Sequence, residues 1–159
     1  MSWRAVAVVG PGKCTEEEAT LALDVGKALA LAGVAVLTGG LGGVMEAASR
    51  GAFEAGGMTI GFLPGLNSTD ANRFVSVPIA TGIGELRNFL IVRAADAIIA
   101  IGGEWGTLSE IAMAMKLGKP VVGLGTWELK STNPATQPIL RAESPDEAVK
   151  LALASLPPS

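Results

Sequence analysis

Residues 97–110 read AIIAIGGEWGTLSE, an apolar run that stops at two glycines and continues as a helical pattern. The run from Ala97 to Ile101 has no polar side chain, which is typical of a strand buried on both faces of a parallel sheet. A helix is expected to begin at Thr107. Its first N–H groups have no partners within the helix, and the helix dipole adds about half a positive charge there. The residues expected to face a phosphate at this helix start are Gly102, Gly103, Gly106 and Thr107.

The same order of strand, loop and helix is repeated along the whole chain. The expected strands are 5–9, 34–37, 58–63, 74–77, 97–101, 121–124 and 138–141, and the expected helices are 16–31, 44–55, 85–94, 107–117 and one from 145 onward. This alternation predicts one α/β domain over residues 1–159, a Rossmann-like doubly wound fold. Its sheet is mostly parallel, with helices on both faces, and its ligand binds beyond the carboxyl ends of the strands.

The composition excludes several classes of protein. Of 159 residues, 49% are apolar and only 17% are charged, so we expect apolar surface that a homo-oligomer, a dimer or a tetramer, covers. The formal net charge is -3 and no basic cluster occurs, which argues against nucleic acid as a partner. The longest apolar stretch, from Ala28 to Leu37, is about half of the ~20 residues that span a bilayer, so no membrane association is expected.

The missing residue types limit the chemistry further. The chain has no histidine, no tyrosine and a single cysteine, Cys14. Catalysis by Ser-His-Asp or Cys-His groups and a histidine-ligated metal site are therefore excluded, and no metal is expected. Residues 1–4 lead directly into a strand without a signal-peptide pattern, so a cytoplasmic location is expected.

Two further glycine loops follow strands. The loop at 38–43 contains more glycine than a turn needs, which favours close approach of the backbone to a phosphate or sugar. Its candidate ligand residues are Gly39, Gly40, Gly42 and Gly43, with Met45 as a further contact. The loop at 10–15 matches a dinucleotide fingerprint only at Gly10 and Gly12, because Thr15 stands where the third glycine belongs. This loop either touches ligand or only turns the chain.

Arg87 stands near the start of the helix expected over 85–94. A cation there opposes the helix dipole by about 0.3–1 kcal/mol unless an anion compensates it, so Arg87 is expected to bind the phosphate. Glu85 or Glu110 is the alternative partner, in a purely structural ion pair. Glu110 has a second interpretation as well, because Thr107 and Glu110 have the spacing of a helix capping box.

The helix expected over 107–117 is apolar on nearly every side. Its core stripe is expected to comprise Leu108, Ile111, Ala112 and Met115. Its remaining apolar residues are Met113, Ala114 and Leu117. Because one core needs only one of these faces, we expect the helix to lie in a subunit interface.

These motifs together resemble the LOG-like Rossmann superfamily, and most of all its molybdenum cofactor carrier protein-like branch. The motifs are the loop at 38–45, the pair Arg87 and Asn88, and the segment 102–110. The resemblance covers roughly residues 6–125. It implies a nucleotide-phosphate-binding Rossmann domain, and it adds Asn88 to the ligand contacts.

Two activities occur among the proteins that this chain resembles. LOG enzymes are phosphoribohydrolases that cleave nucleoside 5'-monophosphates to base and ribose 5-phosphate, and Arg87 and Glu110 match their catalytic pair. Their motif has proline where Ile101 stands, one residue where Glu104 and Trp105 stand, and lysine in place of Asn88. The carrier-like branch has the Arg-Asn pair and the longer glycine gap, as this chain does.

The function expected is therefore binding of a small phosphorylated ligand, a pterin such as the molybdenum cofactor or a nucleotide such as a nucleoside monophosphate. Phosphoribohydrolase activity is the alternative, and only then are Arg87 and Glu110 catalytic. Many proteins of this kind carry a lysine decarboxylase label. That chemistry requires a lysine that binds pyridoxal phosphate, and no lysine here has a recognisable context, so no pyridoxal phosphate is expected.

Overall fold

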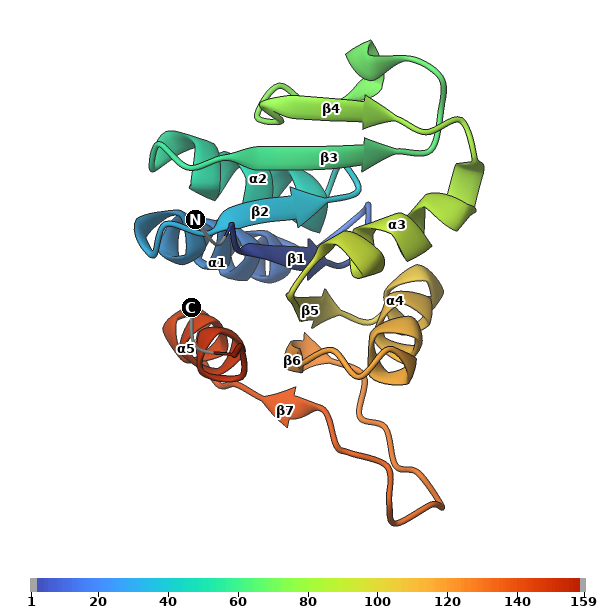
Figure 1. Ribbon diagram of the computed structural model, residues 1–159. Helices are drawn as coiled ribbons and strands as arrows, with labels where there is room; N and C mark the ends of the chain where they lie inside the picture. The colour runs from blue at the N-terminus through green and yellow to red at the C-terminus, as the bar shows by residue number, and fades with distance from the viewer. Residues whose placement is uncertain (1–2, 158–159) are drawn as a thin grey trace.

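The computed structural model describes residues 3–157, which form one twisted sheet between two layers of helices (Figure 1). The strands are β1 (Ala5–Val9), β2 (Ala35–Thr38), β3 (Thr59–Leu63), β4 (Val77–Ala80), β5 (Ala97–Gly102), β6 (Val121–Thr126) and β7 (Leu140–Arg141). The α-helices are α1 (Glu16–Leu31), α2 (Val44–Glu54), α3 (Arg87–Ala94), α4 (Trp105–Lys116) and α5 (Pro145–Ala154). Two short 3₁₀ helices are η1 (Ser68–Asp70) and η2 (Gly84–Leu86). The expectation of no signal peptide is drawn from residues 1–4, of which Met1 and Ser2 lie outside the described residues.

The described part of the sheet has seven strands in the order β4-β3-β2-β1-β5-β6-β7, and every neighbouring pair is parallel. The chain builds outward from β1 to β4, then crosses back and builds outward from β5 to β7. The order therefore reverses between β1 and β5. In a doubly wound fold this reversal point opens a crevice at the carboxyl ends of the strands. The predicted fold class, a Rossmann-like α/β sheet covered on both faces, is confirmed.

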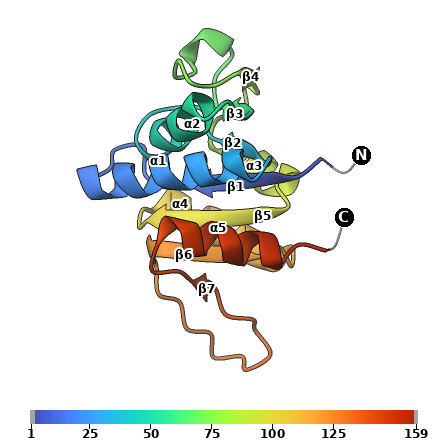
Figure 2. The same cartoon turned by 90° about the vertical axis from the view of Figure 1, so that its left-hand side faces the viewer.

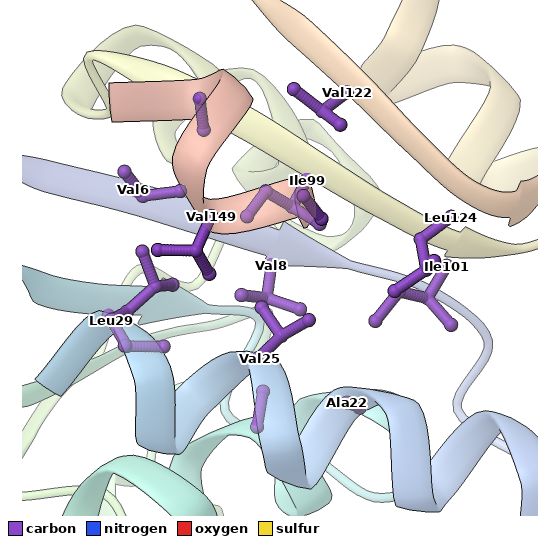
Figure 3. Close-up of a cluster of buried hydrophobic side chains, with 14 of the residues drawn as sticks. Val6, Val8, Ala22, Val25, Leu29, Ile99, Ile101, Val122, Leu124 and Val149 are labelled. Carbon is purple, nitrogen blue, oxygen red and sulfur yellow. The ribbon is translucent and has the colours of Figure 1, made fainter. Parts of the chain in front are cut away.

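Two hydrophobic cores lie on opposite faces of the sheet. One joins alternate residues of β1, β5 and β6 to α1, α2 and α5, and Figure 3 shows its centre around Val8, Val25 and Ile99. The other joins the remaining residues of the same strands to α3 and α4. The central strands are buried along their whole length because both faces are covered, which is why they read as continuous apolar runs.

Two predicted elements are displaced in the structure. The strand expected over 74–77 lies three residues later, as β4 at the edge of the sheet. Phe74 is apolar, as a strand residue would be, but it is buried outside the strand, where its ring contacts the ring of Phe53 and the guanidinium of Arg73. The helix expected over 85–94 begins with the 3₁₀ turn η2 and becomes α-helical only at Arg87.

The predicted core stripe of α4 is partly wrong. Ile111 is buried as expected, but Ala114 is buried and Ala112 is exposed, the reverse of the prediction. The reason is that the side of α4 that faces the sheet includes the polar residues Thr107 and Glu110, which are also buried. Met113 and Leu117, predicted at a subunit interface, are partly buried against the second core. Among residues 3–157, no helix combines the length and the apolar character needed to cross a bilayer.

Candidate functional site

The start of α4 carries no side-chain cap. The first helical residue is Trp105, and Glu104 precedes it in an extended conformation, with φ -103° and ψ 165°. The Glu104 carbonyl accepts a 3.0 Å hydrogen bond from the N–H of Leu108, but the Glu104 side chain caps nothing. The predicted capping box of Thr107 and Glu110 is therefore wrong. The chain turns at Gly102, with φ +73°, and the helix begins at Trp105, two residues earlier than expected, so Thr107 is its third residue.

The start of α2 is uncapped as well. Gly43 precedes the helix with φ +63°, and no side chain accepts from the first N–H groups. A Cβ at Gly43 would collide with the backbone of Pro11 and Gly12, so only glycine fits there. The N–H of Val44 donates to the Pro11 carbonyl at 3.0 Å, which joins the loop before α2 to the loop after β1.

Polar side chains hold the loop at 39–43 in place. The Thr38 hydroxyl is buried and accepts from the Gly40 N–H at 3.1 Å. The amide of Asn72 donates to the Leu41 carbonyl at 2.9 Å and also to the Gly40 carbonyl at 3.3 Å. Sequence reasoning missed both roles, since Asn72 is 31 residues away from Leu41 and nothing in its local pattern points there.

The glycine loops meet around Arg87. A Cβ at Gly39 would lie 2.8 Å from Arg87 Nη2 and 2.6 Å from the sulfur of Met45, so this glycine makes room for both side chains. A Cβ at Gly42 would lie 3.3 Å from the Gly12 carbonyl oxygen, and one at Gly12 would lie 3.6 Å from Met45. Residues from the loops after β1 and β2 and from α3 are thus brought together, as their sequence positions suggested.

Three of the predicted ligand glycines serve packing in the structure. A Cβ at Gly10 would lie 2.6 Å from the Ile101 carbonyl oxygen and from Val44, and one at Gly102 would lie 2.7 Å from the Glu18 carboxylate. Gly40 has φ +76° and packs against Leu63. By contrast, Gly12, Gly103 and Gly106 are exposed. A ligand can therefore reach the backbone of these three glycines, and Gly42 and Gly43 are partly exposed as well.

Arg87 is buried, at 7% exposed, without an ionic partner among the described residues. Its Nη1 donates to the Asn88 side-chain oxygen, and its Nε has no hydrogen-bond partner. Burial lowers the pKa of Arg87, and the nearby Glu110 and Glu85 only partly offset this effect. The ion pairs within residues 3–157 join Arg50 to Glu54 and Arg141 to Glu128, so the structural pair of Arg87 with Glu85 or Glu110 is not formed.

Asn88 lies between Arg87 and the start of α4. Its side-chain oxygen accepts from Arg87, and its amide nitrogen lies 4.0 Å from the position that a Cβ would take at Gly106. The amide therefore presents its donor hydrogens towards the first turn of α4. A guanidinium, an amide and free backbone N–H groups converge there, and all of them are donors suited to an oxyanion.

Glu110 lies one turn further along α4 and is 7% exposed. Its carboxyl group has no hydrogen bond or ion pair with any residue in 3–157. Burial raises the pKa of Glu110 to about 8, although the positive charge of Arg87 acts in the opposite direction. At neutral pH the Glu110 carboxyl group is protonated in most molecules, and in this form it is able to donate a hydrogen bond.

A sizeable cavity lies elsewhere. It encloses about 440 Å³ between the outer face of α4 and the segment 129–139, which extends away from the sheet in Figures 1 and 2. Ala112, Met115, Leu129 and Ile139 are among its lining residues, and none of the predicted ligand residues reaches it. We place the site at the strand ends instead, because the unpaired polar groups gather there. No cluster of three potential metal ligands occurs among residues 3–157.

The sequence model of the SLOG cluster4 family matches residues 3–149. The chain belongs to this family. An uncharacterized protein of Archaeoglobus fulgidus is 40% identical over 156 residues, which are 98% of each chain. The predicted membership of the LOG-like Rossmann superfamily is confirmed.

Two solved structures extend this SLOG comparison. The molybdenum cofactor binding protein of the phototrophic bacterium Rippkaea orientalis is 38% identical with a TM-score of 0.89, and the match covers 97% of this chain and 98% of that one. The molybdenum cofactor carrier protein of Chlamydomonas reinhardtii is 34% identical with a TM-score of 0.83, and the match covers 98% of both chains. The predicted resemblance to the carrier-like branch is therefore also confirmed.

Proposed function

We propose that this protein binds a small phosphorylated ligand at the carboxyl ends of β1, β2 and β5 and holds it without breaking a bond. The observation that carries the proposal is Arg87, a buried guanidinium with an unpartnered Nε that forms no ion pair with any carboxylate in residues 3–157. Leaving a charge buried and unpaired is strongly unfavourable, so an anion is the missing partner. The phosphate would be held by Arg87, Asn88 and the free N–H groups at the start of α4.

The ligand that we propose is a phosphorylated pterin, as in the molybdenum cofactor, or else a nucleotide. Similarity to two molybdenum cofactor proteins over nearly the whole chain supports the pterin. The unpartnered Arg87 Nε and the donor-rich start of α4 fit the phosphate of that ligand. When bound, the molybdenum cofactor would supply its metal chemistry to another protein, and the residues here would only hold and shield it.

Equilibrium titration tests the proposal with the molybdenum cofactor and with AMP. Arg87→Ala removes hydrogen bonds to a charged group, so affinity should fall about 10- to 150-fold. Arg93→Ala is the matched control, because Arg93 is an exposed arginine at the other end of the same helix. Equal affinity of Arg87→Ala and the parent protein for both ligands would sink the proposal.

A phosphoribohydrolase is the second candidate, and the position of Glu110 favours it. Glu110 takes no part in a cap, is buried beside Arg87 and has no protein partner among the described residues. As a hydrolase, the protein would add water across the N-glycosidic bond and release base and ribose 5-phosphate. However, a protonated Glu110 stabilises developing positive charge on the ribose less well than a carboxylate does. We therefore rank binding first.

Free adenine released from AMP distinguishes the two candidates. The binding proposal predicts no adenine above the level of a protein-free control. Adenine release that disappears in Glu110→Gln, while AMP affinity is retained, would establish the hydrolase instead.

A further inference from the structure

Trp105 is a large apolar side chain that the fold leaves in solvent. It is the first residue of α4, and it is 76% exposed. Trp3 is the comparable case, at 58% exposed, but it has no aromatic neighbour among the described residues. Trp105 differs because a second indole packs against it.

That second indole is Trp127, which follows β6. The ring centroids of Trp105 and Trp127 are 5.2 Å apart, with 38° between their planes. The Trp127 Nε1–H donates to the Glu104 carbonyl at 3.1 Å, and its ring covers Gly103, where an added Cβ would lie 3.7 Å from Nε1. Trp127 is thus fixed on the loop that precedes α4. Its indole N–H is already bonded, so Trp127 offers only its ring.

The indole pair adjoins the anion-binding groups. The two rings lie against residues 103–105. The next residue, Gly106, faces the amide of Asn88, which is bonded to Arg87. One turn of α4 therefore has cationic and N–H donors on one side and aromatic rings on the other. Aromatic side chains bind flat heterocycles by stacking, with little regard to which ring is presented.

We propose that Trp105 and Trp127 form a stacking surface for the planar heterocycle of the bound ligand. This inference rests on the proposed function and narrows it: the ligand is a phosphate ester of a flat, bicyclic ring such as a pterin or a purine, and a sugar phosphate alone is a poor ligand. Arg87 and the start of α4 hold the phosphate, and the exposed face of Trp105 covers the ring.

Three probes separate the two halves of the ligand: AMP, 6-hydroxymethylpterin phosphate, and ribose 5-phosphate, which has no aromatic ring. Trp105→Ala should lower the affinity for AMP and for the pterin phosphate about 5- to 150-fold. It should change the affinity for ribose 5-phosphate less than twofold. Trp105→Phe should restore most of the affinity because a phenyl ring still stacks. Trp3→Ala is the control for loss of an exposed indole. Arg87→Ala should lower the affinity for all three probes.

Tryptophan fluorescence gives an independent readout. AMP should quench the emission of the parent protein and of Trp3→Phe, but much less that of Trp105→Phe, because the quenched indole is then absent. The inference is overturned if Trp105→Ala binds AMP and the pterin as the parent does, or if it weakens ribose 5-phosphate equally. It is also overturned if Trp105→Ala only converts an oligomer to monomers, since a second copy then covers the indole. If the parent binds none of the probes, the proposed function fails with it.

Discussion

Four of the described α-helices begin in two different ways, and the difference supports the site that we propose. At α1 the Thr15 hydroxyl accepts from the Glu18 N–H and the Glu18 carboxylate accepts from the Thr15 N–H, at 3.1 and 2.9 Å. At α5 the Ser144 hydroxyl caps in the same way. At α2 and α4 no side chain caps the first turn, and glycine loops precede both helices.

The same contrast extends to charge. The ion pairs of the described chain are exposed, one within α2 and the other between Glu128, after β6, and Arg141 of β7. Arg87 and Glu110 are buried close to the uncapped start of α4 and have no ionic partner in residues 3–157. This gathering of unpaired buried groups at one place supports the binding site that we propose there.

The largest expected effect is the pH dependence caused by Glu110. Its pKa is raised from 4.5 to about 8 in the folded protein, so the folded state keeps a proton that the unfolded chain releases between these values. The contribution of this proton to the free energy of unfolding is fully present below about pH 4.5 and is lost as the pH rises through 8. Between pH 5.5 and 8.5 the loss should be on the order of a few kcal/mol.

Urea unfolding at the two pH values measures this effect, and Glu110→Gln is the control that stays neutral. The parent should lose more stability than the variant does. An equal loss in both proteins would show that Glu110 is not the group responsible.

Arg87 should behave in the opposite way to an ordinary buried ion-pair residue. Replacing it by leucine removes an uncompensated charge from the interior, so the free energy of unfolding should rise by about 1–4 kcal/mol while phosphate affinity is lost. Thermal unfolding without ligand checks the first part. A lower melting temperature in Arg87→Leu would mean that Arg87 stabilises the fold itself, and the contrast between the two kinds of helix start would weaken.

Thr15→Ala tests a capped helix start. Loss of the cap should lower the free energy of unfolding by about 1 kcal/mol. Ligand affinity should stay unchanged, because this helix start satisfies itself. Chemical unfolding and an AMP titration on the same preparation report both quantities, and a marked loss of affinity would place Thr15 in the site.

The smallest expected effect comes from giving α4 the cap that it lacks. In Glu104→Ser, a hydroxyl at the capping position accepts from a first-turn N–H and adds about 0.5–1 kcal/mol of stability. The same hydroxyl competes with the phosphate, so affinity should fall several-fold. Gain of stability together with full affinity would show that the phosphate binds elsewhere. Glu143→Ser, an equal change of residue type outside the site, is the control.

The sequence by itself determined the strands of the interior, the fold class and the family. Runs such as 97–101 are apolar throughout because both faces of the sheet are covered, and the capping signals at Thr15 and Ser144 are local, so each is visible in a few neighbouring residues. The glycine loops and Arg87 were also found from sequence, since their conformational freedom and charge are properties of the residues themselves.

Only the tertiary structure decided what these residues do. The spacing of Thr107 and Glu110 predicts a cap, but the helix begins earlier, at Trp105, and Glu110 is buried without capping it. Trp127 and Asn72 reach the site across long stretches of chain, as partners of loops that are not their neighbours in sequence. Burial, pairing and pKa depend on which residues far apart in the sequence come into contact, and a local sequence pattern does not contain that information.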